Sequence, residues 1–138
     1  MTQPTRQSLD PLESGFNQLV GLCLVAWREG HAEVALTAKA HHLNRSGVLH
    51  GGVLTTLIDV ACGFAGCYSP PDGPIRRAVT LSLTTSFTGP GGLGDLKAVA
   101  AVHSSGRRIF FATAEVVDAA GNALGFGQGT YRYINEVS

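Results

Sequence analysis

The chain has 138 residues, of which 44% are hydrophobic and 14% charged, so it is long and apolar enough to fold as one domain around a substantial core. Its formal net charge is zero and no run of Lys and Arg exceeds two residues, which argues against nucleic acid as a partner. A charge density this low favours a surface that is partly covered in an oligomer.

The polar N-terminal residues are not expected to act as a signal peptide. Residues 1–15 are expected to form an arm in which Asp10-Pro11 starts a short helix, as an N-cap followed by a proline at the first helical position. The arm lacks the apolar core of a signal peptide, and no apolar stretch approaches the roughly 18 residues needed to span a bilayer. We therefore expect a cytoplasmic protein without membrane association, with residues 16–138 forming a single domain.

The cysteines are three, an odd count without a C-x-x-C spacing. This usage suits reduced thiols better than a disulfide framework or a zinc site. Cys23, Cys62 and Cys67 all stand among apolar neighbours, and we expect them to be small core residues.

Alternation of apolar and polar residues predicts strands over residues 19–27, 31–40, 78–88, 95–104, 107–118 and 123–134. A turn at Glu29-Gly30 separates the first two, and similarly short separators between the last three favour an antiparallel meander. In the strand over 78–88 we expect the apolar residues on one face and the hydroxyl residues on the other: Val79, Leu81, Leu83 and Phe87 against Thr80, Ser82, Thr84 and Ser86.

One substantial helix is expected between the second and third strands, from about Gly51 to Gly66. It is apolar nearly all round, which indicates burial on more than one side. The fold class predicted is therefore α+β, with one long central helix wrapped by a curved antiparallel sheet of five or six strands.

The start of this helix is a candidate site. Gly51 and Gly52 leave its first backbone N–H groups unobstructed, and these groups carry roughly half a positive charge. Aimed at a carbonyl oxygen, they would stabilise the oxyanion that develops during acyl transfer. The alternative is that the two glycines only allow a tight passage from loop to helix.

Asp59 is the one carboxylate in the helix. It lies eight residues after Gly51, which places it roughly 12 Å further along the helix axis. Joint action of the two on one carbonyl therefore requires Asp59 from a second copy of the chain, across a two-fold axis that sets two such helices antiparallel. The alternative is a buried carboxylate satisfied by a backbone N–H or by an arginine such as Arg76 or Arg77, since an unpaired buried charge costs several kcal/mol.

Two residues of the preceding loop complete the candidate set. Asn44 could hold a water or fix the loop through its amide, and His50 could orient a substrate carbonyl or Asn44. Each also has a purely structural alternative, as a turn residue and as a structural histidine.

These residues form the pattern N-x-x-G-x-x-H-G-G with an acid eight residues after the first glycine of the pair: Asn44, Gly47, His50, Gly51, Gly52 and Asp59. The pattern resembles that of the hotdog-fold acyl-CoA thioesterases, in particular the PaaI-like group named for phenylacetate catabolism. The segments F-T-G-P-G-G-L-G-D-L-K-A and G-R-R-x-x-x-x-x-A-E-V-V-D-x-x-G are similar to the same group. The resemblance thus spans roughly residues 16–134.

The resemblance implies an acyl-CoA substrate, with Asp59 as nucleophile or general base and the Gly51 N–H polarising the thioester carbonyl. Asn44, His50 and Gly52 would help to bind and orient. Related enzymes carry a hydroxyl residue one turn after the acid, where this chain has Gly63, and Thr80 is a candidate replacement. The resemblance also implies a homodimer with shared sites, commonly paired again into a homotetramer.

Coenzyme A carries phosphates, which suit the planar fork of arginine. Among the available cations, Arg107 and Arg108 are the pair we expect first to bind them. The acyl group stays open between aromatic and medium-chain.

Two other functions are alternatives to a thioesterase. A hotdog hydratase or dehydratase acting on acyl thioesters and a non-catalytic acyl-CoA-binding dimer are the alternatives. No G-x-S-x-G elbow of a serine hydrolase is present, and the histidines lack a metal spacing, so neither metal nor cofactor is expected. Residues 89–94 match G-x-G-x-x-G, but we expect them to form a hairpin loop before a strand rather than to open a dinucleotide-binding helix.

Overall fold

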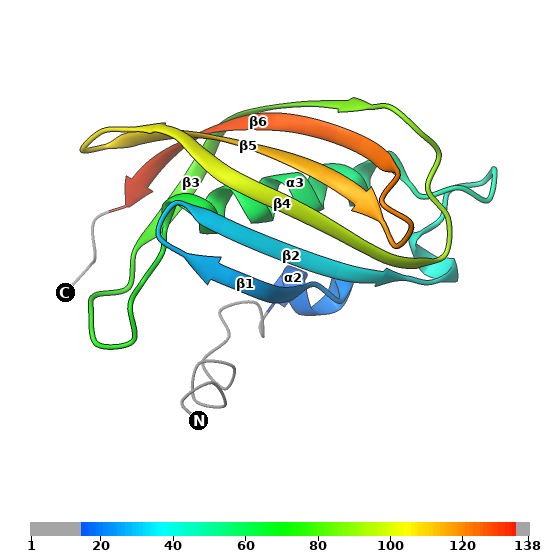
Figure 1. The fold of residues 1–138 in the computed structure, drawn as a ribbon, viewed down its shortest axis with the longest axis horizontal. Coiled ribbons are helices and arrows are strands. Elements are labelled where there is room, and N and C mark those ends of the chain that lie inside the picture. The colour runs from blue at the N-terminus through cyan, green and yellow to red at the C-terminus, as the bar shows by residue number, and fades with distance from the viewer. Residues whose placement is uncertain (1–14, 135–138) are drawn as a thin grey trace.

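The computed structural model describes residues 15–134. Its elements follow in chain order in Figure 1: α2 (Gly15–Val20), β1 (Cys23–Arg28), β2 (His31–Ala38), the 3-10 helix η1 (Ala40–His42), α3 (Gly51–Gly66), β3 (Arg77–Phe87), β4 (Gly94–Ser105), β5 (Ile109–Asp118) and β6 (Ala123–Ile134). The expected long helix is confirmed, and so is a sheet of six strands. The helix start expected at Asp10-Pro11 lies outside the described residues.

All six strands belong to one antiparallel sheet with the order β1-β2-β4-β5-β6-β3. β1 and β2 form a hairpin, and β4, β5 and β6 form the expected meander. β3 pairs with β6 at the far edge, while β4 pairs with β2 and β5. The prediction of a hairpin loop at residues 89–94 was therefore wrong. This connection crosses between non-neighbouring strands, although it leads into a strand as expected.

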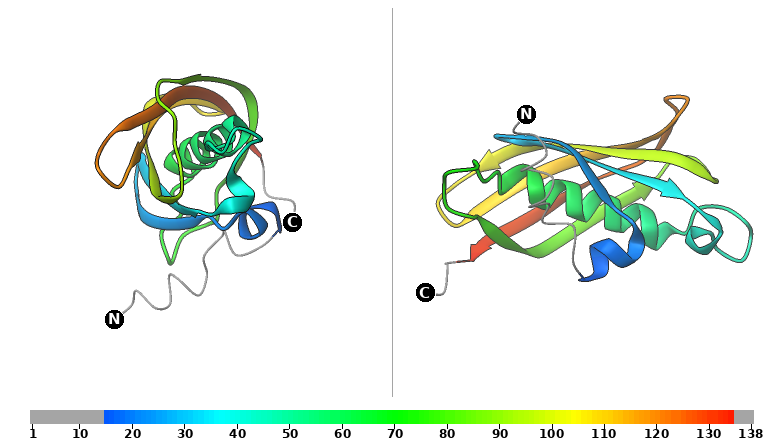
Figure 2. Two further views of the ribbon diagram at one scale, coloured as in Figure 1. Left: turned by 90° about the vertical axis from the view of Figure 1, so that its right-hand side faces the viewer. Right: turned by 90° about the horizontal axis from the view of Figure 1, so that it is seen from below.

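The sheet curls around α3, as the view along the helix in Figure 2 shows. The helix buries Leu54, Leu57, Ile58 and Ala61, each at most 3% exposed, against the inner face of the sheet. The strands meet it with small buried side chains such as those of Ala98 and Ala112 on β4 and β5. Small inner-face residues let the helix axis approach the sheet closely, which gives the dense packing typical of a protein core.

One face of α3 remains uncovered by strands. The second view in Figure 2 shows the helix running between the edge strands β1 and β3. Along this face Gly52 is exposed, and Thr56, Asp59 and Gly63 are partly exposed. The sequence predicted that α3 is buried on more than one side. The sheet covers part of the helix circumference and leaves this face open.

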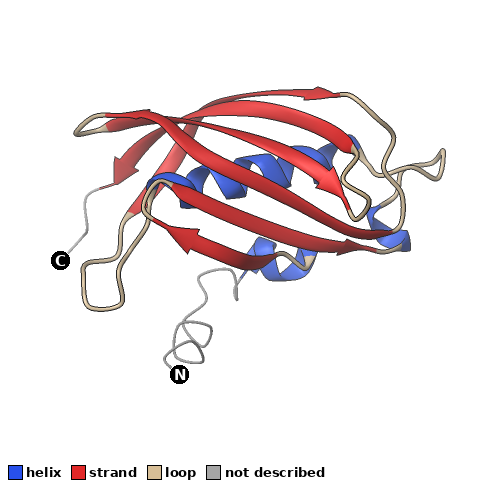
Figure 3. Ribbon diagram, viewed as in Figure 1, coloured by secondary structure: helices blue, strands red, loops and turns tan. Residues whose placement is uncertain are grey.

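The loop before α3 and the β3–β4 connection lie together at the end of the molecule where α3 begins (Figure 3). The Leu49 N–H donates to the carbonyl of Gly91 at 2.8 Å, and the Thr88 N–H donates to that of Leu124 at 2.9 Å. These bonds join the loop before α3 to the β3–β4 connection, and that connection to the start of β6.

The first expected strand starts four residues later than predicted. Residues 19 and 20 end the short helix α2, and Gly21 follows with a φ of +96°, a conformation that favours glycine after a helix. His42, 4% exposed, secures this helix end, since its Nε2–H donates to the Val20 carbonyl at 2.7 Å. Within residues 19–22, Val20 and Leu22 therefore pack on the core from a helix end and the turn after it, whereas Leu19 is 80% exposed. Alternation alone does not distinguish this arrangement from a strand.

The expected faces of the strand over 78–88 were wrong at its first half. Thr80 lies opposite Tyr131 and Ser82 lies opposite Thr130, so Leu81 is an extra residue in a β-bulge. The bulge turns Thr80 toward α3 and leaves Val79 and Leu81 47% and 55% exposed. Beyond it, Leu83 packs against the core as predicted.

Within residues 15–134, no helix is both long enough and apolar enough to cross a membrane.

Candidate active site

The first turn of α3 is capped by the residue before it. His50 is the N-cap, and its Nδ1 accepts the Gly52 N–H at 2.8 Å. The His50 carbonyl accepts the Val53 N–H at 2.9 Å. Among residues 15–134 the Gly51 N–H has no hydrogen-bond partner. The donor expected to polarise a carbonyl is therefore the one that the helix start leaves available.

Both glycines at this start are also closely packed. A Cβ added to Gly51 would lie 3.0 Å from the Phe87 ring, and one added to Gly52 would lie 2.9 Å from Nδ1 of His50. Packing alone thus disfavours a side chain at either position, so the structural and the functional reading of the glycine pair are compatible.

Asn44 organises the loop that leads to the cap. Its Oδ1 accepts the N–H groups of Ser46 and Val48 at 2.9 and 3.2 Å. Its own N–H donates to the Val48 carbonyl at 2.7 Å, and Gly47 adopts the φ of +79° that the turn requires. The amide therefore fixes the loop that leads to Gly51, and both Asn44 and His50 are exposed to solvent.

Asp59 lies on the uncovered face of α3, on the side of β3. Its Oδ1 accepts the hydroxyl of Thr80 at 2.8 Å and that of Tyr131 at 2.9 Å. No arginine pairs with it among the described residues, and Arg76 instead stands 4.4 Å from the centroid of the Tyr133 ring. Two hydroxyl donors, rather than a cation, explain how the helix tolerates this acid.

Tyr131 was not among the site residues predicted from the sequence. This side chain is 2% exposed, and burial raises the pKa of its phenol far above the ordinary value, with Cys62 and the charge of Asp59 adding to the effect. The sequence contains a weak indication of this role. Gly125, Gly127 and Gly129 precede Tyr131 on the same face of β6, so Tyr131 is the first residue of that series with a polar side-chain group that can reach α3. The register of β6 against the helix, which decides the contact, is tertiary information.

The cysteines divide into two kinds. Cys62 and Cys67 are buried as expected, whereas Cys23 is exposed, so the expectation of three core thiols was wrong for that residue. Burial raises the pKa of Cys62 to about 12, and the nearby charge of Asp59 contributes. Cys62 is therefore a neutral thiol beside the site and unsuited to act as a nucleophile.

One chain does not bring all the candidate residues together. Asn44, His50 and Gly51 lie at the start of α3, and Asp59 with Thr80 lies roughly 12 Å further along it. Arg107 and Arg108 are exposed in the β4–β5 turn. That turn lies at the end of the molecule where α3 finishes, away from Gly51 (Figure 1).

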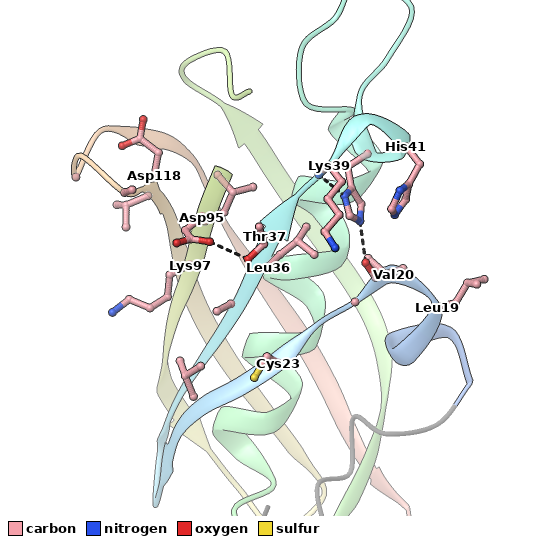
Figure 4. A pocket seen from close by; sticks show the side chains of 18 residues that line it. Leu19, Val20, Cys23, Leu36, Thr37, Lys39, His41, Asp95, Lys97 and Asp118 are labelled. Carbon is pink, nitrogen blue, oxygen red and sulfur yellow. Dashed lines mark hydrogen bonds between the residues drawn. The ribbon is translucent and has the colours of Figure 1, made fainter. Parts of the chain in front are cut away.

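A hollow of about 1000 Å³ lies elsewhere, between α2, the outer side of β1, β2 and β4, and the β5–β6 turn (Figure 4). Thr37 and Asp95 line it and are joined by a hydrogen bond of 2.8 Å. None of the predicted site residues lines this hollow. Among the described residues, no three His, Cys, Asp or Glu side chains are grouped as metal ligands.

A long helix held in a curled antiparallel sheet, with a glycine-opened start and one acid on its uncovered face, defines a hotdog protein of the thioesterase type. A sequence profile of the Thioesterase superfamily matches residues 46–124, more than half of the chain. The chain belongs to that superfamily and is PaaI-like.

Individual relatives agree with this assignment. The acyl-coenzyme A thioesterase PaaI of Escherichia coli is 34% identical over 72% of this chain and 68% of its own length. The structure of the conserved protein PA5202 from Pseudomonas aeruginosa superposes with a TM-score of 0.79 at 39% identity, covering 88% of this chain and 94% of that one. PA0474 of the same species is 38% identical over 60% of this chain, and the match spans only 61% of its own length.

Proposed function

We propose that this protein is an acyl-CoA thioesterase that hydrolyses an aromatic or medium-chain acyl-CoA to the free acid and CoA. The observation that carries the proposal is the pairing of an available Gly51 N–H at a helix start with a half-buried Asp59 on the uncovered face of the same helix. The relatives support the reaction class, because the E. coli PaaI protein is named an acyl-coenzyme A thioesterase.

In the proposed reaction the Gly51 N–H donates to the thioester carbonyl oxygen and stabilises the negative charge that develops on it. Asp59 either attacks the carbonyl carbon or takes a proton from a water that attacks it. The C–S bond breaks, CoA leaves as a thiolate that takes up a proton, and water supplies the second oxygen of the acid. Asn44 keeps the loop before α3 in place, and His50 fixes the cap.

The reaction requires a dimer with shared sites. Each chain presents the Gly51 N–H and Asp59 at places too far apart for one carbonyl, so Asp59 comes from the partner chain. The uncovered face of α3 and the adjoining edge strand β3, with Val79 and Leu81 exposed, offer the surface on which two chains would meet. Pairing of two such dimers into a homotetramer is part of the same proposal.

Two further roles belong to the proposal. Thr80, which donates to Asp59, substitutes for the hydroxyl residue that would stand at Gly63. Arg107 and Arg108 bind the phosphates of CoA from the exposed β4–β5 turn. Because that turn lies at the end of α3 opposite to Gly51, an antiparallel partner would bring its own pair toward this chain's Gly51.

The test is free-thiol release from a panel of phenylacetyl-, hydroxybenzoyl- and medium-chain acyl-CoAs, with wild type and Asp59→Asn in parallel. Wild type should turn over one subset, and Asp59→Asn should lower kcat on it by two or more orders of magnitude, since the amide keeps the shape but is neither nucleophile nor base. Circular dichroism would show that the variant is folded.

The contrary result is equally definite. If no panel member is hydrolysed while both proteins bind the same acyl-CoAs tightly, the protein is an acyl-CoA-binding module and the proposal fails. Hydration of enoyl-CoA substrates without thiol release would instead identify a hydratase.

A further inference from the structure

Tyr131 on β6 donates its hydroxyl to Asp59 from the inner face of the sheet. Its hydroxyl lies 2.9 Å from Oδ1 of Asp59 and 3.0 Å from the backbone carbonyl oxygen of the same residue. Tyr131 comes from β6, while Thr80, the other donor to Oδ1, comes from the adjacent strand β3. One carboxylate oxygen is therefore held from two strands at once.

The phenol has little freedom to move. Its ring stacks on Phe110 with centroids 4.9 Å apart and planes inclined by 10°. It also leans over Gly129, where an added Cβ would lie 2.4 Å from the ring. Because burial keeps the phenol protonated, its O–H is a permanent donor, and it can only hold the carboxylate and cannot take its proton.

The two carboxylate oxygens of Asp59 consequently differ. Oδ1 accepts two hydroxyl groups, whereas Oδ2 has no donor within residues 15–134. A carboxylate fixed through one oxygen has its plane fixed as well, and its second oxygen then points in one direction with its lone pairs free.

We infer that Tyr131 is a positioning residue of the active site, which holds Oδ1 of Asp59 so that Oδ2 is the oxygen that attacks the thioester or takes the proton of water. The inference rests on the proposed thioesterase function. It assigns to β6 a part in the reaction that the motif around α3 does not contain.

A matched control lies two residues along the same strand. Tyr133 also donates its hydroxyl to α3, at 2.7 Å, but to the carbonyl oxygen of Gly66. Its ring likewise packs against Phe110, with centroids 5.0 Å apart. Tyr131→Phe and Tyr133→Phe therefore each remove one phenol hydroxyl that donates from β6 to α3, and only the hydroxyl of Tyr131 contacts Asp59, at Oδ1 and at the backbone carbonyl oxygen.

The experiment compares kcat and KM of wild type, Tyr131→Phe and Tyr133→Phe on the best substrate of the panel. Tyr131→Phe should lower kcat by about 10- to 100-fold with KM within about twofold, because Tyr131 holds the reacting group and does not contact the substrate. Tyr133→Phe should leave both constants within about twofold. Thermal unfolding shows whether both variants are folded at the assay temperature. Calorimetric binding of a non-hydrolysable thioether analogue, unchanged in both, would show that the substrate pocket is intact.

Two outcomes would overturn the inference in different ways. If wild type is active and Tyr131→Phe retains the kcat of Tyr133→Phe, Tyr131 is structural and only this inference fails. If wild type hydrolyses no thioester, the proposed function fails and takes the role of Tyr131 with it. A Tyr131→Phe protein that binds the analogue more weakly, with kcat unchanged, would also contradict a positioning role.

Discussion

At the scale of single residues, the site depends on which polar groups the fold leaves available. Among residues 15–134, His50 accepts the Gly52 N–H and leaves that of Gly51 without a partner, and two hydroxyl groups donate to Oδ1 of Asp59 and leave Oδ2 without a donor. For Cys62 and Cys67, by contrast, burial makes the polar group unavailable. Burial raises the pKa of Cys62 to about 12 and that of Cys67 to about 11, so neither forms a thiolate at the pH at which a thioesterase would be assayed.

We predict that a disulfide reagent for thiols, applied to the native protein at pH 8, reacts rapidly with Cys23 alone. Cys62 and Cys67 should react only after unfolding, because they are buried and their pKa values are raised. The measurement is the absorbance released with time, and Cys23→Ser should remove the rapid phase. Rapid reaction of all the thiols in the folded protein would contradict the burial of Cys62 and Cys67.

At the scale of elements, the contact between α3 and the sheet depends on where a helix glycine meets a large side chain. At Gly66 an added Cβ would lie 2.1 Å from the ring of Phe110 on β5. At Gly63, one turn earlier on the uncovered face, it would lie 3.6 Å from the Tyr131 ring, an ordinary contact. The two glycines therefore have different reasons to be present, although the sequence shows both in the same helix.

We predict that the same substitution destabilises the protein at Gly66 and does not destabilise it at Gly63. Gly66→Ala should lower the free energy of unfolding by about 1–3 kcal/mol through overpacking against Phe110. Gly63→Ala should leave it unchanged or raise it by up to about 1 kcal/mol, because alanine is the better helix former. Denaturant titrations at one protein concentration would measure both. Equal effects of the two substitutions would show that α3 does not meet β5 as described.

At the scale of the whole molecule, the geometry of α3 favours a dimer. One helix carries both the N–H that we propose polarises the carbonyl and the acid, roughly 12 Å apart, and it exposes the face between β1 and β3 on which the acid lies. A second chain packed there in antiparallel orientation would complete two equivalent sites. Exposed Val79 and Leu81 beside that face are apolar surface that such packing would cover.

We predict that two inactive variants restore activity in each other. Asp59→Asn and Gly51→Val chains should each be inactive as homodimers, whereas co-expressed chains should regain about a quarter of the wild-type activity, since half of the dimers are mixed and each mixed dimer has one intact site of two. Separately purified variants that are mixed without exchange of subunits serve as the control. Activity in a strictly monomeric wild type, or no gain in verified mixed dimers, would contradict a shared site.

The sequence by itself determined the long helix, the positions of most strands, the family motif, and the isolation of Asp59 in an apolar helix. These are local properties, since periodicity and spacing reflect which side chains share one face of one element. The separation of Gly51 from Asp59 follows from helix rise alone, and the proposal of a second chain follows from that separation.

Only the tertiary structure decided what surrounds Asp59. Alternation placed Thr80 on the face opposite to Leu83, and the bulge at Leu81 turned it toward the helix. Tyr131, which contacts the same carboxylate from β6, follows Asp59 by 72 residues in the chain. The placement of β3 at the sheet edge beside β6 brings these two hydroxyls together. Strand order, bulges and the register of strand against helix are set by packing between distant segments, and no local pattern encodes them.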